Sequence, residues 1–310
     1  MGRHVVVGAG QVGGALAVAL AERGHEVTVV TRSGSGPRRA GVSPVAADAG
    51  DAAVMRRLAE GADAIYNCVN PPYHRWQEDW PPVAASLLAA AESSGAVLVT
   101  LGNLYGYGPV DGPMTEDLPL AATGVKGRVR ARMWEEMRAA HEAGRVRVTE
   151  VRGSDYYGPG SSDQSYLGPR LLEPLLGGKP ATVVSDPDIP HSWTYLPDVV
   201  RALAAAAEEE RAWGRPWHVP TAPPVTMREY AEMVCEAGGV PAPRLRRLPG
   251  WMLKAGGLAV PFLRELGETR YQFDRPYVLD SSASQEVLGF APTPVEDGVK
   301  ETVAWWRTRR

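Results

Sequence analysis

The sequence has 310 residues, of which 44% are hydrophobic and 22% are charged, and its formal net charge is −3. This composition is typical of a folded globular protein, and the length suffices for one large domain or two smaller ones. The weak negative charge argues against a general attraction to nucleic acid or to an anionic membrane. The two cysteines, Cys68 and Cys235, cannot supply a disulfide framework or a cysteine-rich metal centre, so we expect no metal.

The chain begins MGRHVVVGAG, and its first apolar run ends at a glycine. This run is too short for a secretory signal or a membrane span, and no later apolar run approaches the roughly 20 residues that a membrane helix needs. Together with the low cysteine content, these features predict a cytoplasmic protein with a small-molecule substrate and with no membrane or nucleic-acid partner.

Short β-branched runs alternate with alanine- and leucine-rich stretches through the first half of the chain. Three of the helical stretches end in glycine, at Gly24, Gly95 and Gly144, which is a common helix terminator. This alternation predicts βαβ units and an α/β fold with a doubly wound parallel sheet. The strands are expected at 4–9, 25–32, 62–69, 96–102 and 145–153, and the helices at 12–24, 51–61, 82–95 and 126–144.

A glycine-rich turn follows the first predicted strand and opens the first predicted helix. We expect Gly8 to form the tight turn, Gly10 to let a pyrophosphate approach the backbone, and Gly13 to let helix and strand pack closely. Gln11 and Val12 belong to the same turn and are expected to contact the ligand. The βαβ context predicts a Rossmann-type dinucleotide site, the alternative being a glycine turn that binds nothing.

The end of the second predicted strand indicates which dinucleotide to expect. NAD sites usually place an acidic side chain there, but this strand ends in Thr31 and Arg32. A guanidinium suits a 2′-phosphate, so we predict NADP(H) over NAD(H), unless Arg32 is merely a solvated loop residue. Asp48 is expected near the adenine, with a helix-capping or loop role as the alternative. Cys68 and Asn70, at the end of the fourth strand, complete the predicted cofactor-binding set.

The composition of the sequence changes after Gly153, where proline and glycine become frequent. We predict an NADP-binding Rossmann domain from residues 1–155 together with about 190–220. Residues 156–189 and 221–310 are expected to form a smaller, mixed α/β substrate-binding domain that includes a helix at 250–266.

Five further motifs point to one family. They are LYGYGP at 104–109, MTEDLPL at 114–120, VRGSDYYGPG at 151–160, HSWTYLPDVVRALAAA at 191–206 and the C-terminal EVLGFAPTPVEDGVKETVAWWR at 286–307. With the glycine turn, they resemble the extended short-chain dehydrogenase/reductase superfamily, also called the NAD-dependent epimerase/dehydratase family. The resemblance covers nearly the whole chain and implies hydride transfer to or from a nicotinamide. It also makes a homodimer through the helices at 82–95 and 126–143 plausible.

The catalytic motif of that family is altered here. Its members typically carry Tyr-x-x-x-Lys on a helix and a Ser or Thr after the fifth strand. The family's usual spacing from Tyr105 puts Lys126 in the tyrosine position and Arg130 in the lysine position, and Leu101 falls in the Ser/Thr position with Asn103 as a polar neighbour. The resemblance therefore implies an atypical proton donor.

Three side chains are candidate proton donors. Lys126, beside Arg130 in a partly dry site, is suited to donate to a carbonyl oxygen, or else it contacts a cofactor ribose. Tyr105 and Tyr107 leave the edge of the sheet where ligands of doubly wound folds gather, and either phenol is a second candidate or a wall residue.

Aromatic side chains are dense in the segments expected to shape the substrate pocket. They argue for a flat or apolar substrate, although packing between domains explains some of them. Family members acting on nucleotide sugars often have an arginine where this chain has His191. The predicted pocket residues are Tyr73, Trp76, Tyr156, Tyr157, His191 and Trp193.

The sequence thus predicts an NADP(H)-dependent oxidoreductase of a small or medium, aromatic or apolar carbonyl or alcohol. Two alternatives stay open: a sugar-nucleotide epimerase or dehydratase, and a cofactor-binding sensor without turnover.

Overall fold

The central element of the fold is a seven-stranded, fully parallel sheet with the strand order β10-β6-β5-β4-β1-β2-β3. It is seen in a computed structural model that describes residues 1–163, 165–248 and 267–309, so the helix expected at 250–266 lies outside the described residues. The order reverses at β1, as in a doubly wound sheet, and the predicted fold class is confirmed. The strands are β1 (Arg3–Val7), β2 (Glu26–Thr31), β3 (Val42–Ala46), β4 (Ala64–Asn67), β5 (Val97–Asn103), β6 (Arg147–Gly153) and β10 (Pro216–His218).

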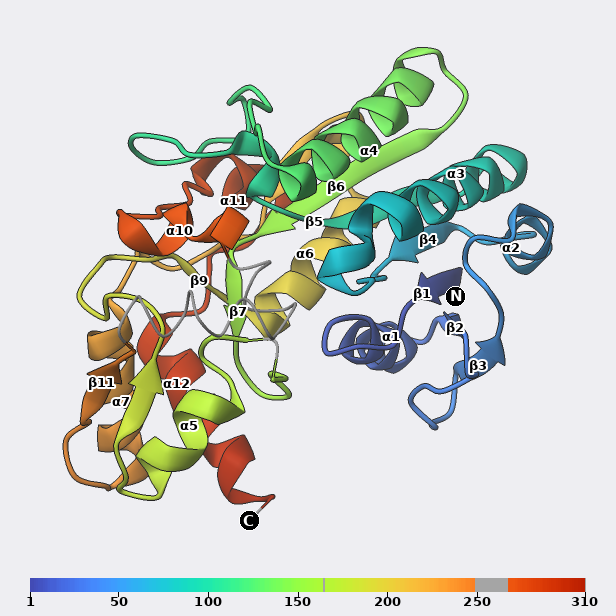
Figure 1. Ribbon diagram of the computed structural model, residues 1–310. Coiled ribbons are helices and arrows are strands. Elements are labelled where there is room, and N and C mark those ends of the chain that lie inside the picture. The colour runs from blue at the N-terminus through green and yellow to red at the C-terminus, as the bar shows by residue number, and fades with distance from the viewer. Residues whose placement is uncertain (164, 249–266, 310) are drawn as a thin grey trace.

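Helices cover both faces of this sheet (Figure 1). On one face α1 (Gly13–Glu22) packs against α6 (Leu196–Glu208), over a core that includes Leu16, Leu20 and Leu203. On the other face α3 (Trp76–Ser94) packs between α2 (Ala52–Leu58) and α4 (Val125–Glu142). Because both faces are buried, β1 and β4 bury successive residues with no alternation, including Val5, Val6 and Val7 in β1. The carboxyl ends of β1, β4, β5 and β6 consequently share one edge of the sheet.

The start of α3 differs from the sequence prediction. We expected this helix at 82–95. The helix instead begins at Trp76 and includes Pro81 and Pro82. Trp76 and Trp80 are one helical turn apart and both are buried, so their packing stabilises the helical turn that precedes the two prolines.

The second part of the structure lies to one side of the sheet (Figure 1). Two small parallel sheets, one from β7 (Asp155–Tyr157) with β9 (Trp193–Tyr195) and one from β8 (Ala181–Val183) with β11 (Leu245–Arg247), accompany the helices. Leu172, Tyr230 and Val299 lie in its separate core. The helices are α5 (Pro169–Leu176), α7 (Met227–Gly238), α10 (Tyr271–Asp274), α11 (Ser282–Leu288) and α12 (Val295–Arg307).

The chain crosses between the two parts several times. After β9, helix α6 and strand β10 return to the large sheet, and α11 packs against both of them. The domain division at 1–155 with about 190–220, against 156–189 with 221–310, stays a prediction. The position of α11 on the large sheet shows that contacts cross that division.

Candidate active site

A cavity of about 360 Å³ lies at the carboxyl-terminal edge of the large sheet. Its walls come from the glycine turn, from the segments that follow β4 and β5, and from the junction of β6 with β7. Gln272 and Tyr277 contribute from the second part of the structure. The cavity is therefore lined by both parts of the chain, at the edge where ligands of doubly wound sheets bind.

The glycine turn has the geometry of a dinucleotide cradle. Gly8 has a φ of +96°, and a Cβ there would lie 2.6 Å from the carbonyl oxygen of Cys68. A Cβ on Gly13 would lie 2.0 Å from the Gly8 carbonyl oxygen, so α1 and β1 pack too closely for any side chain. A Cβ on Gly10 would meet no atom within 4 Å, and Gly10 lines the cavity. The space beside Gly10, at the amino end of α1, fits a pyrophosphate.

The predicted adenine-side residues lie at the same sheet edge but do not line the cavity. The Thr31 hydroxyl donates to the carbonyl oxygen of Ser35 over 2.8 Å, and the carboxylate of Asp48 accepts from the backbone N–H of Gly50 over 2.9 Å. Arg32 is exposed. Among the described residues it makes no hydrogen bond or ion pair, so its guanidinium is available to a ligand.

Two phenols form a hydrogen-bonded pair in the cavity wall. The hydroxyls of Tyr73 and Tyr105 lie 3.1 Å apart, and the Trp76 ring stacks on Tyr105 at a centroid distance of 6.0 Å. Burial, then the neighbouring Tyr73 and the charge of Asp155, raise the pKa of Tyr105 well above its usual value. The Tyr105 phenol therefore keeps its proton at neutral pH, and it acts as a hydrogen-bond donor and not as a base.

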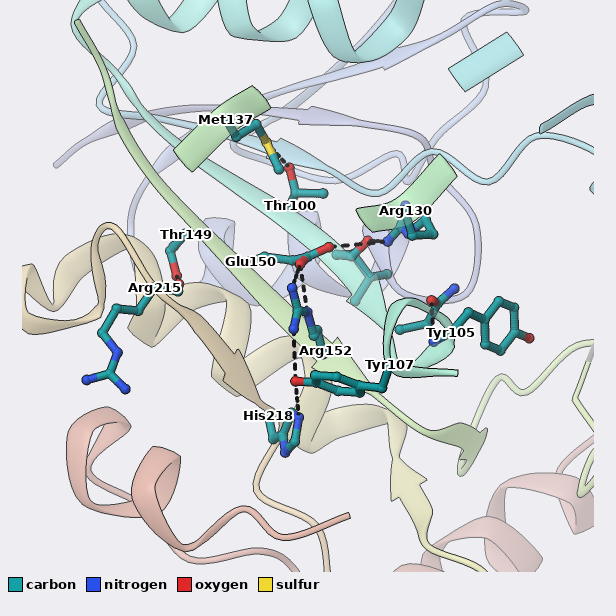
Figure 2. A network of polar contacts seen from close by, with 12 residues as sticks. Thr100, Tyr105, Tyr107, Arg130, Met137, Thr149, Glu150, Arg152, Arg215 and His218 are labelled. Atoms are coloured by element: carbon teal, nitrogen blue, oxygen red, sulfur yellow. Dashed lines mark hydrogen bonds and ion pairs between the residues drawn. The ribbon is translucent and has the colours of Figure 1, made fainter. Parts of the chain in front are cut away.

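Tyr107 lies only two residues from Tyr105 but belongs to a different environment. Its hydroxyl accepts from Arg152 Nη1 over 2.8 Å and donates to His218 Nε2 over 2.8 Å. His218 Nδ1 in turn donates to the carbonyl oxygen of Asp280 over 2.6 Å. Figure 2 shows the contacts of Tyr107 with Arg152 and His218, with the Tyr105 ring pointing away from them. The hydroxyl of Tyr107 is thus engaged outside the cavity lining, which leaves Tyr105 as the phenol positioned for a substrate.

A buried charge cluster connects this network, through Arg152 and Glu150, to Arg130 (Figure 2). Glu150 accepts from Arg152 Nε and Nη2, each over 2.7 Å, and its other oxygen is 4.0 Å from Arg130 Nη2. Arg130 also donates to the carbonyl oxygen of Leu101, packs over the rings of Trp76 and Trp80, and reaches the cavity wall. Two guanidinium groups facing one carboxylate leave this cluster with one excess positive charge, and Arg130 is the member that reaches the cavity.

Lys126 does not line the cavity itself, although its Nζ lies 5.8 Å from the ring centroid of the wall residue Tyr73. It is buried at the start of α4, where its Nζ lies 3.1 Å from Glu268 Oε2 and its backbone N–H donates to Glu268 Oε1 over 2.7 Å. Arg130, one helical turn further on, lines the cavity, as does Asn103 after β5. Of the predicted catalytic residues, Asn103 and Tyr105 are therefore at the cavity, whereas Lys126 and Tyr107 are not.

The predicted substrate-pocket residues also divide into two groups. Tyr73, Trp76 and Tyr156 line the cavity. Tyr157 lies in the core of the second part, and the Trp193 indole N–H donates to the carbonyl oxygen of Val225 over 3.0 Å. Most of the aromatic rings that suggested a flat substrate pack against one another or against the core.

Sequence reasoning missed several wall residues, among them Asp155, Gln272 and Tyr277. Asp155 lies within the recognised segment VRGSDYYGPG, but its carboxylate was not singled out there. Gln272 and Tyr277 carry no motif, and only tertiary contacts bring them to the cavity. Asp155 Oδ2 lies 2.8 Å from Nε2 of His191. His191, which the sequence predicted as a pocket residue, therefore does not line the cavity itself but contacts a residue that does.

Neither a membrane-spanning helix nor a metal-ion cluster is present within residues 1–163, 165–248 and 267–309. No helix there has the length and apolarity to cross a bilayer. No group of three or more histidine, cysteine, aspartate or glutamate side chains is arranged there to hold a metal ion.

Comparison with known proteins gives consistent matches. The model of the NAD dependent epimerase/dehydratase family matches residues 4–219. A dTDP-glucose 4,6-dehydratase of an Actinoplanes species is 30% identical over 206 residues, which are 66% of this chain but only 58% of the relative. A UDP-glucose 4-epimerase of Corynebacterium glutamicum is 25% identical and covers 92% of this chain and 96% of the relative. The UDP-glucose 4-epimerase of Thermotoga maritima, solved with UDP-glucose, superposes with a TM-score of 0.80 at 19% identity, covering 99% of both chains.

Proposed function

Because the chain belongs to the NAD-dependent epimerase/dehydratase family, we propose that it binds a nicotinamide adenine dinucleotide and catalyses hydride transfer on a nucleotide-linked sugar. One observation carries the proposal: the open space beside Gly10 and the phenol pair of Tyr73 and Tyr105 face the same cavity. A cofactor laid along the glycine turn would thus reach the polar wall after β5.

The lining of the cavity supports a hydroxyl-rich substrate over the aromatic or apolar one that the sequence suggested. Trp76 and Trp80 are almost wholly buried, so their rings are packing elements and not open platforms. The polar side chains at the cavity can exchange several hydrogen bonds with sugar hydroxyls. They are Asn103, Ser154, Asp155, Ser162, Ser165 and Gln272.

The chemistry follows from the groups in the wall. The cofactor, when bound, accepts or returns the hydride of a carbon that bears a hydroxyl. Tyr105 donates a hydrogen bond to the oxygen on that carbon, because its raised pKa keeps the phenol protonated. The positive charge of Arg130 stabilises negative charge that develops on the same oxygen during the reaction. The altered Tyr-x-x-x-Lys motif is replaced, in this proposal, by groups that reach the cavity from other elements.

The choice between NAD and NADP depends on Arg32. Its guanidinium makes no hydrogen bond or ion pair with the residues that the structure describes, and β2 ends without an acidic residue. Both features support NADP, whereas the description of the family supports NAD. If Arg32 contacts a 2′-phosphate, Arg32→Ala weakens NADPH binding by roughly 10- to 100-fold and leaves NADH binding unchanged, as expected for a charge-assisted hydrogen bond.

Fluorescence titration of both reduced cofactors measures this ratio. Arg39→Ala is the matched control, because Arg39 lies in the same loop but its guanidinium is held by Glu22 at 2.7 Å. Equal losses for NADPH and NADH in Arg32→Ala, or tighter binding of NADH by the wild-type protein, would rule out the NADP preference.

The activity is tested with dTDP-glucose, UDP-glucose and a simple dicarbonyl such as phenanthrenequinone, each with either cofactor. Conversion of a sugar nucleotide supports the proposal. Reduction of the dicarbonyl alone would indicate a general carbonyl reductase and would contradict the proposed sugar substrate. Tight cofactor binding without conversion of any compound identifies a sensor and contradicts the proposal.

A further inference from the structure

We infer that Asp155 is the catalytic residue that exchanges the hydroxyl proton of the substrate in this cavity, and that His191 is the residue that positions its carboxylate. This inference rests on the proposed function and adds the base that the altered Tyr-x-x-x-Lys motif leaves unassigned. Neither the family match nor the altered motif points to this pair. It follows from the arrangement of the cavity wall.

Asp155 is the only carboxylate among the described residues that line the cavity. The other titratable groups there are unsuited to take a proton at neutral pH. Burial raises the pKa of the Cys68 thiol to about 12 and raises the pKa of Tyr73 and Tyr105. Arg130 is a permanent cation without a lone pair to offer. A hydroxyl that loses hydride needs a group that accepts its proton, and Asp155 is the one in place.

His191 holds the carboxylate from behind. Its Nε2 lies 2.8 Å from Asp155 Oδ2. The imidazole is fixed between two aromatic rings, Trp193 at a centroid distance of 4.2 Å and Phe273 at 5.0 Å with planes only 5° apart. Backbone hydrogen bonds with Val225, in both directions, fix its main chain. The imidazole therefore has one orientation, and so does the carboxylate oxygen it holds.

The surroundings of His191 also determine its tautomer. Its Nδ1 is buried and has no hydrogen-bond partner among the described residues. A doubly protonated imidazole would leave a charged N–H unpaired in this aromatic stack, which is costly. A neutral imidazole with its proton on Nε2 donates a hydrogen bond to Asp155. Only the lone pair on Nδ1 then lacks a hydrogen-bond partner among the described residues. This tautomer requires an ionised carboxylate on Asp155, which is the form that accepts a proton.

The cluster is not a hydrolytic triad, although Ser154 lies beside it. The Ser154 hydroxyl is 3.5 Å from His191 Nε2, the same nitrogen that contacts Asp155. In a nucleophilic triad the serine and the carboxylate contact opposite nitrogens of the imidazole. His191 therefore cannot act on Ser154 while it holds Asp155.

The proposed step balances as follows. In the oxidising direction the C–H electron pair and proton leave together as hydride to the oxidised dinucleotide, and the O–H bond breaks as its proton moves to Asp155. The carbonyl forms from the remaining electron pair on oxygen. In the reducing direction Asp155 returns the proton to the oxygen that receives hydride at its carbon.

Other charged or titratable groups face Asp155 from several elements. They are His191 before β9, Tyr73 before α3, Tyr105 after β5, Tyr156 in β7, Tyr166 before α5, and Tyr271 and Tyr277 near α10. The pKa of every one of these phenols is raised, in part by the charge of Asp155. The raised pKa values keep these phenols protonated near neutral pH, so they do not compete with Asp155 as proton acceptors.

The test compares Asp155→Asn with the wild-type enzyme on whichever of dTDP-glucose or UDP-glucose is converted. The asparagine keeps the shape and can still accept the hydrogen bond from His191. We expect kcat to fall by about 100- to 10,000-fold, the range for loss of a general base, with unchanged cofactor Kd. The acidic limb of the kcat pH profile should also disappear. Asp188→Asn is the matched control, because Asp188 is exposed and pairs with Arg228.

A rescue experiment separates a chemical role from a structural one. Asp155→Ala should regain activity when formate is added, because a small carboxylate can occupy the vacated space. Formate should not affect the Asp188→Asn control. An Asp155→Asn enzyme within threefold of the wild-type kcat, with the same pH profile, would overturn the inference. That result differs from failure of the proposed function, in which the wild-type protein itself converts no substrate.

A second measurement does not depend on turnover. Long-range ¹H–¹⁵N correlation spectra of protein labelled at histidine should show His191 neutral and protonated at Nε2 at pH 7, and Asp155→Leu should change its signal. Protonation of His191 at Nδ1 alone would mean that Asp155 carries the shared proton. This outcome would contradict its role as a base even if no substrate is known.

Discussion

The buried charge cluster beneath the cavity makes a quantitative prediction about stability. Glu150 is 3% exposed and contacts Arg152 at 2.7 Å and Arg130 at 4.0 Å, and the two arginine side chains are 4% and 5% exposed. Substitution Glu150→Gln keeps the shape of the side chain but removes its charge. It leaves two guanidinium groups in the interior with no opposing carboxylate within this cluster.

The expected cost follows from the contacts that are lost. Removing one partner from a buried ion pair typically costs 3–5 kcal/mol, and the glutamine oxygen still accepts one hydrogen bond, so we expect a loss of about 3 kcal/mol. For a chain of this size that corresponds to a fall in Tm of roughly 6 °C. Urea unfolding followed by circular dichroism measures the free energy of unfolding directly.

Glu136→Gln is the matched control for this experiment. Glu136 pairs with Arg132 at 2.8 Å on the outer face of α4, where the two side chains are 52% and 80% exposed. Solvent screens this pair, so its loss should cost less than about 1 kcal/mol. A loss below 1 kcal/mol for Glu150→Gln as well would refute the view that the cluster depends on its single carboxylate.

Two further predictions concern the tyrosines and the buried histidine. Tyr105→Phe removes the cavity-facing hydroxyl and should lower kcat roughly 10- to 100-fold with little change in cofactor affinity, as measured by steady-state kinetics; an unchanged kcat would exclude Tyr105 from the reaction. Burial, with Arg152 acting in the same direction, lowers the pKa of His218 to about 4. Below about pH 6.5 the unfolded chain therefore binds a proton at this histidine, whereas the folded chain binds it only below about pH 4. The stability present above pH 6.5 is therefore lost on acidification, by about 2 kcal/mol between pH 7 and pH 5, and the His218→Gln variant should lack this part of the decline in urea unfolding.

The glycine turn shows how far the sequence alone reaches. Its spacing after a strand predicted the tight turn at Gly8 and the close packing at Gly13, and the structure has both. Such local motifs are readable because the backbone geometry they require admits almost no residue other than glycine. The family resemblance was confirmed by the match over residues 4–219.

Side-chain environments could not be predicted from the sequence in the same way. Tyr105 and Tyr107 are two residues apart in one short turn, yet one faces the cavity and the other a buried arginine. Lys126 was expected at the reacting centre, and its Nζ pairs with the distant Glu268 at 3.1 Å, close to the ring of the wall residue Tyr73. These outcomes depend on partners more than 30 positions away in the chain, which no local pattern encodes.

The central claim is that this cavity carries out hydride transfer on a sugar, and one measurement tests it most directly. Protein loaded with the oxidised cofactor is mixed with dTDP-glucose or UDP-glucose in a stopped-flow instrument, and the near-ultraviolet absorbance of reduced nicotinamide is followed. The account predicts a rise in this absorbance in the wild-type protein and a much slower rise in Asp155→Asn. Saturable binding of cofactor and sugar nucleotide with no absorbance change in the wild-type protein would contradict it.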